Sequence, residues 1–143
     1  MNRIIIIFLI LSIMFKQTIS ANTANISKTN YGTYINTSNI SYDEKNNILE
    51  LSENSKINIE DTNILIDRGI IDYNKNEIEV FGNFYLYQEL NILSGKDLKG
   101  DTKLNNFTAK DVSYIYNDNL KIDSKIAKRS EDIIYFYNNF LTP

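Results

Sequence analysis

The sequence predicts an all-β protein, and three observations support this prediction. From residue 39 onward, short stretches of alternating apolar and polar residues recur between polar turns, which is the pattern of strands with one buried face. The 143 residues include 24 Ile, 10 Tyr and 7 Phe, which favour strands and argue against disorder despite 21 Asn. No window of eleven or more residues keeps a helical period together with a capping signal.

The first twenty residues have the layout of a secretory signal peptide. Arg3 precedes a nearly continuous apolar run over residues 4–15, and a polar stretch leads to Ala21. The run of about a dozen residues is shorter than the roughly 20 that a membrane-spanning helix needs. An uncleaved anchor helix is the alternative, because Lys16 is tolerable at a membrane edge. No Cys follows the run, which excludes a lipoprotein anchor.

The expected strands begin after a polar lead-in. Residues 21–38 are rich in Asn, Thr and Ser, so we expect a flexible lead-in with at most one edge strand. The folded domain is expected over residues 39–143, with strands over most of 47–95 and 107–140. The stretch 130–140 is the best helix candidate, but its Ile, Tyr and Phe predict a strand.

The chain repeats with a period of 29 residues. Sliding the sequence by 29 places Asp43 on Asp72 without a gap, and it also aligns Asn47 with Asn76, Leu49 with Ile78, Leu51 with Val80 and Ile57 with Leu86. Each unit is interpreted as a β-hairpin, with turns at 43–47 and 72–76 and tight reversals at Glu53-Asn54 and Gly82-Asn83. A weaker third unit covers about 106–140, with its turn at 116–120. A coincidence driven by the high Asn and Ile content is the alternative.

Composition excludes most catalytic chemistry. The chain has no His and no Cys, so it contains no Ser-His-Asp triad, Cys nucleophile or zinc finger. Beyond residue 20 there are 13 basic and 18 acidic side chains, and this net charge of −5 argues against a nucleic-acid partner. The acidic pairs Asp43-Glu44, Glu60-Asp61 and Glu131-Asp132 could suggest a two-carboxylate glycosidase or a calcium site, but solvated turns are favoured. We expect neither an enzyme nor a cofactor or metal site.

In the first two units, Tyr42-Asp43 is followed by a polar turn and a strand up to Leu51, and the strand ending at Asp67 leads to Val80-Phe81-Gly82-Asn83. In these residues the chain resembles the OstA-like repeat of lipopolysaccharide-transport proteins. The resemblance covers about residues 39–143. It implies an open β-jellyroll, the fold shared by LptA, LptC and the N-terminal domain of LptD.

The end of the sequence favours one branch of this family. Residues 135–143 are similar to the segment where the LptD jellyroll passes into its barrel. We therefore expect an LptD-like chain truncated before that barrel domain, whereas a protein that acts alone, as LptA does, is the alternative.

The resemblance implies a periplasmic lipid-transport module associated with the outer membrane. Such a module binds the acyl chains of lipopolysaccharide on an apolar face, because each exposed methylene costs about 0.8 kcal/mol in water. The alternating pattern predicts the inward positions that would form this groove, or simply a core: Leu49, Leu51, Ile57, Ile59, Ile64, Ile66, Ile78, Val80, Phe84 and Leu86.

Two further expectations concern partners and an alternative function. The edge strands, which begin after Ser38 and end with about 133–140, are expected to pair with another periplasmic jellyroll. The basic residues 125–129 could touch lipid phosphates, although a solvated loop is favoured. A secreted β-domain with a structural or adhesive role is the alternative function.

Overall fold

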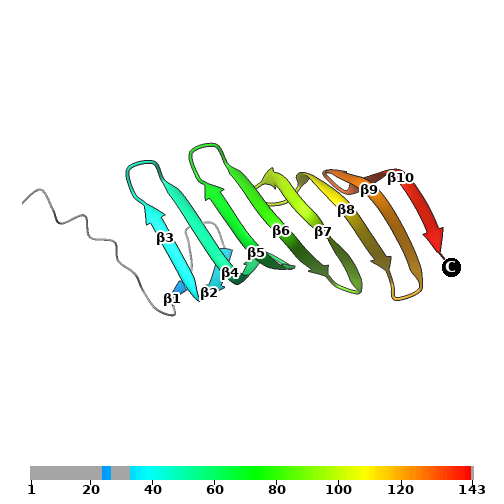
Figure 1. Cartoon of the computed structure of the whole chain (residues 1–143), viewed down its shortest axis with the longest axis horizontal. Coiled ribbons are helices and arrows are strands. Elements are labelled where there is room, and N and C mark those ends of the chain that lie inside the picture. The colour runs from blue at the N-terminus through cyan, green and yellow to red at the C-terminus, as the bar shows by residue number, and fades with distance from the viewer. Residues whose placement is uncertain (1–23, 27–32, 143) are drawn as a thin grey trace, which may run out of the picture.

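The computed structural model describes residues 24–26 and 33–142, and every regular element in these ranges is a strand (Figure 1). The prediction of an all-β fold is therefore confirmed. The expected signal peptide, residues 1–20, lies outside the described ranges. Within those ranges, no helix has the length and apolar character needed to cross a membrane. The strands are β1 (Ala24–Ile26), β2 (Thr33–Thr37), β3 (Asn39–Asp43), β4 (Ile48–Ile59), β5 (Thr62–Asp72), β6 (Glu77–Gln88), β7 (Asn91–Asp101), β8 (Asn106–Tyr116), β9 (Leu120–Ser130) and β10 (Ile133–Thr142).

These strands form one antiparallel sheet in the order β1-β2-β4-β5-β6-β7-β8-β9-β10. Strand β4 is long enough for two partners, because residues 56–59 pair with β2 and residues 48–52 pair with β3. The strands β2 and β3 are thus two segments of one line, separated by a bend at Ser38. The sheet does not close on itself, since β1 and β3 lie at one end and β10 lies at the other (Figure 1).

The sheet begins earlier than the sequence suggested. Strands β1 and β2 lie in the stretch 21–38 that was expected to be a lead-in. In β2, Thr33, Ile35 and Thr37 are buried, whereas Tyr34 is half exposed. Five residues with one aliphatic side chain give a weak sequence signal. They form a strand because Ile35 packs into the core and the backbone pairs with β4.

Most of the long strands carry a bulge near the middle. The pairing register shifts between Ser52 and Ser55 in β4, between Ile66 and Arg68 in β5, and between Val80 and Asn83 in β6. Five residues near the middle of their strands also have a left-handed backbone, and we call these positions the fold line: Asn54, Gly82, Asp97, Asp111 and Asn138. A bulge bends its strand and increases the local twist. A row of bulges therefore folds the whole sheet along one line.

The bulges also keep the apolar side chains on one face. In β5, Ile64 and Ile66 are buried before the bulge and Ile71 is buried after it, so the buried positions change from even to odd numbers. A bulge adds one residue to its strand, so the alternation of side chains shifts by one position there. The apolar residues shift by one position as well, and they therefore stay on the same face. Both halves of each strand thus point into the same interior.

The tight reversals predicted at Glu53-Asn54 and Gly82-Asn83 are wrong. Both pairs lie inside strands, in β4 and β6, and the chain reverses instead at residues 60–61 and 89–90. Gly and Asn favour a left-handed backbone in a bulge as much as in a turn, so the residue types alone do not separate the two structures. The pairing of β4 and β6 with their neighbours on both sides of the bulge decides for a continuous strand.

Aspartates on adjacent strands satisfy the backbone of the β6 bulge. The Asp67 carboxylate accepts hydrogen bonds from the backbone and side-chain N–H groups of Asn83, each at 2.9 Å. The Asp97 carboxylate accepts one from the Gly82 backbone N–H at 3.2 Å, and this bond holds the pKa of Asp97 below its ordinary value. Near the other end of the sheet, the Ser124 hydroxyl lies 2.6 Å from the Tyr137 carbonyl oxygen.

The turns at 43–47 and 72–76 are confirmed, and the repeat extends to a third turn that the sequence comparison missed. Asp43, Asp72 and Asp101 are spaced by 29 residues, and each accepts backbone hydrogen bonds from the turn that follows it. Partial burial raises the pKa of Asp101, but the bonds from Asn106 and from the turn backbone lower it more, so that its pKa lies below 3.8. The predicted turn at 116–120 is also present, at residues 117–119.

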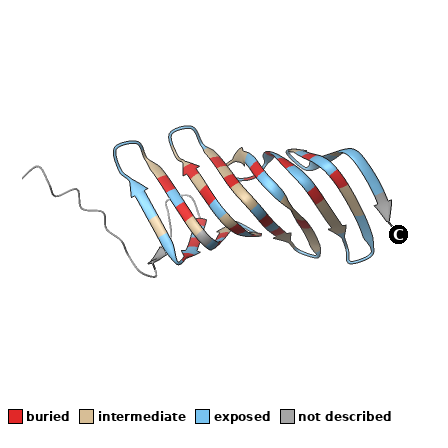
Figure 2. Ribbon diagram, viewed as in Figure 1, coloured by how far each residue is buried: buried red, intermediate tan, exposed pale blue. Residues whose placement is uncertain are grey.

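Buried residues recur along β2 and along β4 to β9 (Figure 2), and their alternation within each half of a strand places them on one face of the sheet. Nineteen buried apolar side chains of the described residues form a single cluster. The fold line divides each long strand into two segments. We call the segments that pair in line with β3, such as residues 48–52, 68–72 and 77–80, the β3 half. Those in line with β2, such as residues 56–59, 62–66 and 84–88, form the β2 half. The halves face each other, because Arg129 of β9 lies 3.5 Å from the Gln88 side-chain oxygen of β6, three strands away.

Adjacent residues of β5 test the two faces. Ile64→Asp should lower the free energy of unfolding by at least about 3 kcal/mol, because Ile64 is fully buried and the carboxylate would have no partner. Leu65→Asp should cost less than about 1 kcal/mol, because Leu65 is 38% exposed on the outer face. Urea unfolding followed by far-UV circular dichroism measures both. Equal losses would contradict the assignment of the faces.

The third repeat aspartate predicts a pH effect. Asp101→Asn should lower the free energy of unfolding by about 1 kcal/mol at pH 7, since the carboxylate accepts several turn N–H groups. A lowered folded-state pKa stabilises above 3.8, and that stability is lost as the pH falls through the folded value. The difference between wild type and variant should therefore shrink between pH 5 and pH 2. An equal difference at pH 7 and at pH 2 would contradict the role of the Asp101 carboxylate in this turn.

Candidate functional site

All ten residues predicted to point inward do so. They lie on β4, β5 and β6, and none is more than 5% exposed. They contribute about half of the core cluster: Leu49, Leu51, Ile57, Ile59, Ile64, Ile66, Ile78, Val80, Phe84 and Leu86. These side chains therefore pack against one another between the two halves of the folded sheet.

The same inner face continues through β7, β8 and β9, which the sequence did not predict. In β7, Leu93 precedes the register shifts and Leu98 follows them, and both side chains are buried. The two positions are five residues apart, so they do not fit a simple alternation. In β8 and β9 the inner positions include Ala109 and Ala127, both fully buried. Alanine gives little apolar signal in a sequence. Extending the 29-residue repeat past residue 90 is the signal that could have found these positions.

A pocket of about 360 Å³ opens into the inner face on the side opposite the fold line. Ile59 of the β2 half lines one wall, and Ile71 and Ile78 of the β3 half line the other. Glu60 and Lys103 stand at its rim, in the β4–β5 and β7–β8 turns. We call this opening the mouth pocket. Its apolar walls include two of the ten predicted positions, so it gives access to the predicted groove.

The inner face ends in aromatic residues near β10. The rings of Tyr114 and Phe136 lie 5.5 Å apart, and Tyr116 is 6.5 Å from Tyr114. Burial raises the pKa of the Tyr114 hydroxyl. Arg129 lies on the same face, where its Nε donates to the Glu131 carbonyl oxygen at 2.7 Å. The C-terminal end of the interior is thus less aliphatic than the part built by β4–β6.

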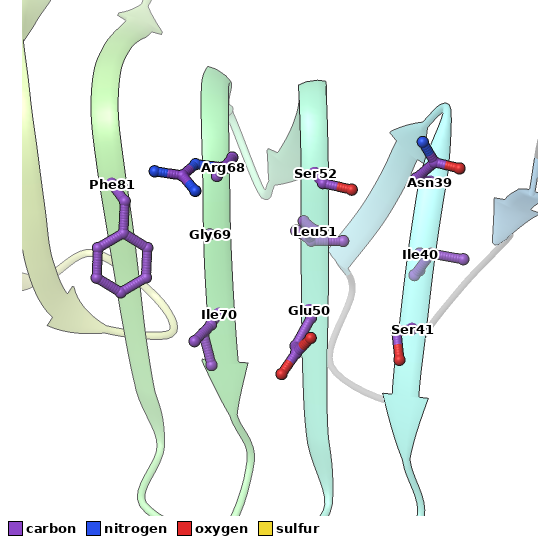
Figure 3. Close-up of a pocket in the computed structure, with 10 residues that line it drawn as sticks. All are labelled: Asn39, Ile40, Ser41, Glu50, Leu51, Ser52, Arg68, Gly69, Ile70 and Phe81. Carbon is purple, nitrogen blue, oxygen red and sulfur yellow. The ribbon is translucent and has the colours of Figure 1, made fainter. Parts of the chain in front are cut away.

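A second, larger depression of about 500 Å³ lies on the outer face (Figure 3). It extends over β3, β4, β5 and β6, and Arg68 and Phe81 are paired neighbours in its lining. Five of its ten lining residues are polar or charged, and Leu51 is the only predicted groove residue among them. It does not open between the two halves of the sheet. The lining comprises Asn39, Ile40, Ser41, Glu50, Leu51, Ser52, Arg68, Gly69, Ile70 and Phe81.

The other charged motifs lie in turns and on strands. The pairs Glu60-Asp61 and Glu131-Asp132 occupy the β4–β5 and β9–β10 turns. Within the described part of the chain, no group of three or more acidic side chains is arranged to hold a metal ion. The expectation of a loop at residues 125–129 is wrong, because these residues lie within β9 and pair with β8 and β10. Lys128 points outward and Arg129 inward, which a linear cluster of charges does not reveal.

Comparison with known proteins gives a match in structure but none in sequence. No protein-family model and no curated protein sequence match the chain. A similar solved structure is that of LptH from Pseudomonas aeruginosa, the LptA-homologous periplasmic component of the conserved lipopolysaccharide transport device. The match has a TM-score of 0.67 at 10% sequence identity and covers 78% of this chain and 94% of LptH. The predicted open β-jellyroll of the LptA type is therefore confirmed as the fold of this chain.

Proposed function

We propose that the protein is a periplasmic lipid-transport module that holds the acyl chains of lipopolysaccharide between the two halves of its sheet and passes them toward the outer membrane. The observation that carries this proposal is the fold shared with a periplasmic transport component, combined with an apolar inner face that runs along the sheet. In this proposal, the ten residues on β4–β6 form the groove. No catalytic step is required.

The physical basis is the transfer of methylene groups out of water. Each buried methylene contributes about 0.8 kcal/mol, so several acyl chains need a long apolar surface. In the structure, the ten groove side chains pack within one buried cluster. An acyl chain would enter at the mouth pocket, past Ile59, Ile71 and Ile78, and separate the β2 half from the β3 half. The bends along the fold line would then act as the hinge, since the strands pass from one half to the other there.

The ends of the sheet offer sites for partners. At the C-terminal end, β9 is the one described strand that pairs with β10, so within the described part of the chain the other edge of β10 has unpaired backbone groups. Its outward side chains Tyr135, Tyr137 and Phe140 are 46%, 48% and 74% exposed. We propose that β3 or β10 adds a strand to another periplasmic jellyroll, or that β10 contacts a barrel domain of a longer chain. A cleaved signal peptide over residues 1–20 would direct the protein to the periplasm.

One observation favours a second candidate, a secreted β-domain with a structural or adhesive role. The ten groove residues are at most 5% exposed, as in an ordinary core. In that case the inner face would serve stability alone and would bind no lipid.

Photo-crosslinking at two adjacent positions of β6 separates these candidates. A benzophenone amino acid at Phe84, which points inward, should crosslink to added lipopolysaccharide, whereas the same residue at Tyr85, which is 48% exposed on the outer face, should not. Gel electrophoresis with lipopolysaccharide detection measures both. Absence of crosslinks at both positions in folded protein would favour the structural role.

The edges are tested in the same way in a cell that makes lipopolysaccharide. The crosslinker at Ser41 of β3 or at Tyr137 of β10 should capture a periplasmic jellyroll protein, identified by mass spectrometry. The control is Thr108, an exposed residue of the central strand β8. Capture at Thr108 alone, or at none of the three positions, would contradict pairing through the edges.

A further inference from the structure

Arg129 is a cation on the inner face. It pairs with Phe107 of β8, which is 3% exposed, and with Ile134 of β10, which packs against the core. Its neighbour two residues earlier, Ala127, is fully buried on the same side. Among the strand residues whose described side chains point inward, Arg129 alone carries a charge.

This charge has neutral partners. The Arg129 Nε donates to the backbone oxygen of Glu131 at 2.7 Å, and an Nη donates to the side-chain oxygen of Gln88 at 3.5 Å. No carboxylate in the described part of the chain forms an ion pair with Arg129. A guanidinium has five N–H donors, of which these bonds use two. A half-buried cation without a counter-ion is unfavourable unless an anion joins it.

Arg129 lies near the ends of two strands, where the two halves of the sheet meet opposite the fold line. It is one residue from the end of β9, and Gln88 is the last residue of β6, so their contact joins the two halves opposite the fold line. The aromatic end of the interior, with Tyr114 and Phe136, lies on the same face. An amphiphile bound between the halves at this point would place its apolar part against these rings and its head group near Arg129.

We propose that Arg129 binds the phosphate of an acylated phospholipid-like or glycolipid amphiphile whose chain lies between the two halves of the sheet. This inference rests on the proposed function and adds the head-group subsite to it. Guanidinium and phosphate form paired, charge-assisted hydrogen bonds, which suit this ligand better than a neutral sugar. Binding would exchange the bond to Gln88 for bonds to phosphate oxygens. Arg129 would thus release one contact between the halves when the ligand enters.

Calorimetric titration with three probes tests this inference on the purified chain. Decyl phosphate, below its micelle concentration, should bind at least tenfold more tightly than decyl glucoside, a difference of at least about 1.4 kcal/mol, because a hydrogen bond to a charged group is stronger than one to a neutral group. Inorganic phosphate should bind at least tenfold more weakly than decyl phosphate. Equal affinity for decyl phosphate and inorganic phosphate would show a free-anion site and overturn the proposal.

Variants of adjacent residues give the controls. Arg129→Gln should reduce the preference for phosphate over glucoside to about one, whereas Lys128→Gln removes an equal charge from the outer face and should preserve the preference. Gln88→Ala breaks the contact between the halves but keeps the guanidinium, so it should also preserve the preference. Arg129→Lys retains the charge and should keep part of the preference for phosphate over glucoside. This variant replaces Arg129→Gln in the test if Arg129→Gln fails to fold.

Two outcomes are distinguishable. If both decyl compounds bind but Arg129→Gln keeps the preference, or if Gln88→Ala loses it, the phosphate subsite is wrong and the lipid groove stands. If neither decyl compound binds wild-type protein, the proposed function fails and the subsite fails with it.

Discussion

The backbone at the fold line is the constraint on which the rest of the structure depends. A flat sheet with one apolar face would expose that face to water, and a single sheet has no second layer to cover it. The left-handed residues at Asn54, Gly82, Asp97, Asp111 and Asn138 let the sheet cover itself. Each bulge leaves backbone groups outside the ladder, and polar side chains such as Asp67 and Asp97 accept hydrogen bonds from them.

The bend of the sheet requires glycine at two positions near the fold line. At Gly82, φ is +87° and an added Cβ would lie 2.8 Å from the Asp67 carboxylate, so this position combines a backbone and a space requirement. At Gly95 an added Cβ would lie 2.8 Å from the Lys110 carbonyl oxygen and 3.1 Å from the Phe84 ring. The absence of a side chain there lets β7 and β8 approach closely where the two halves meet.

Sequence reasoning predicted the strands and the inner face best where Ile and Leu alternate regularly, in β4, β5 and β6. It failed at the fold line, because Gly82 and Asn54 favour the same backbone in a turn and in a bulge. It missed the inner positions of β8 and β9, where Ala109 and Ala127 are small. The inward direction of Arg129 was also hidden, since the buried positions of β9 change from even at Ser124 to odd at Ala127, and the pairing with Phe107 reveals it.

The repeat of 29 residues gives the molecule a linear organisation. Among the described strands, each one from β5 to β10 pairs only with its neighbours in sequence, and β4 pairs with β5 and with the two short strands β2 and β3. In such an array, stability is approximately a sum of unit and nearest-neighbour terms, and folding can begin at any hairpin and propagate. If one more unit of two strands were inserted between β6 and β7, each of these two strands would pair with an inserted strand, and the pairing of the remaining strands would not change. Length along the sheet is therefore an independent variable in this architecture, and evolution can adjust the span of the apolar face by whole units while the cross-section stays constant.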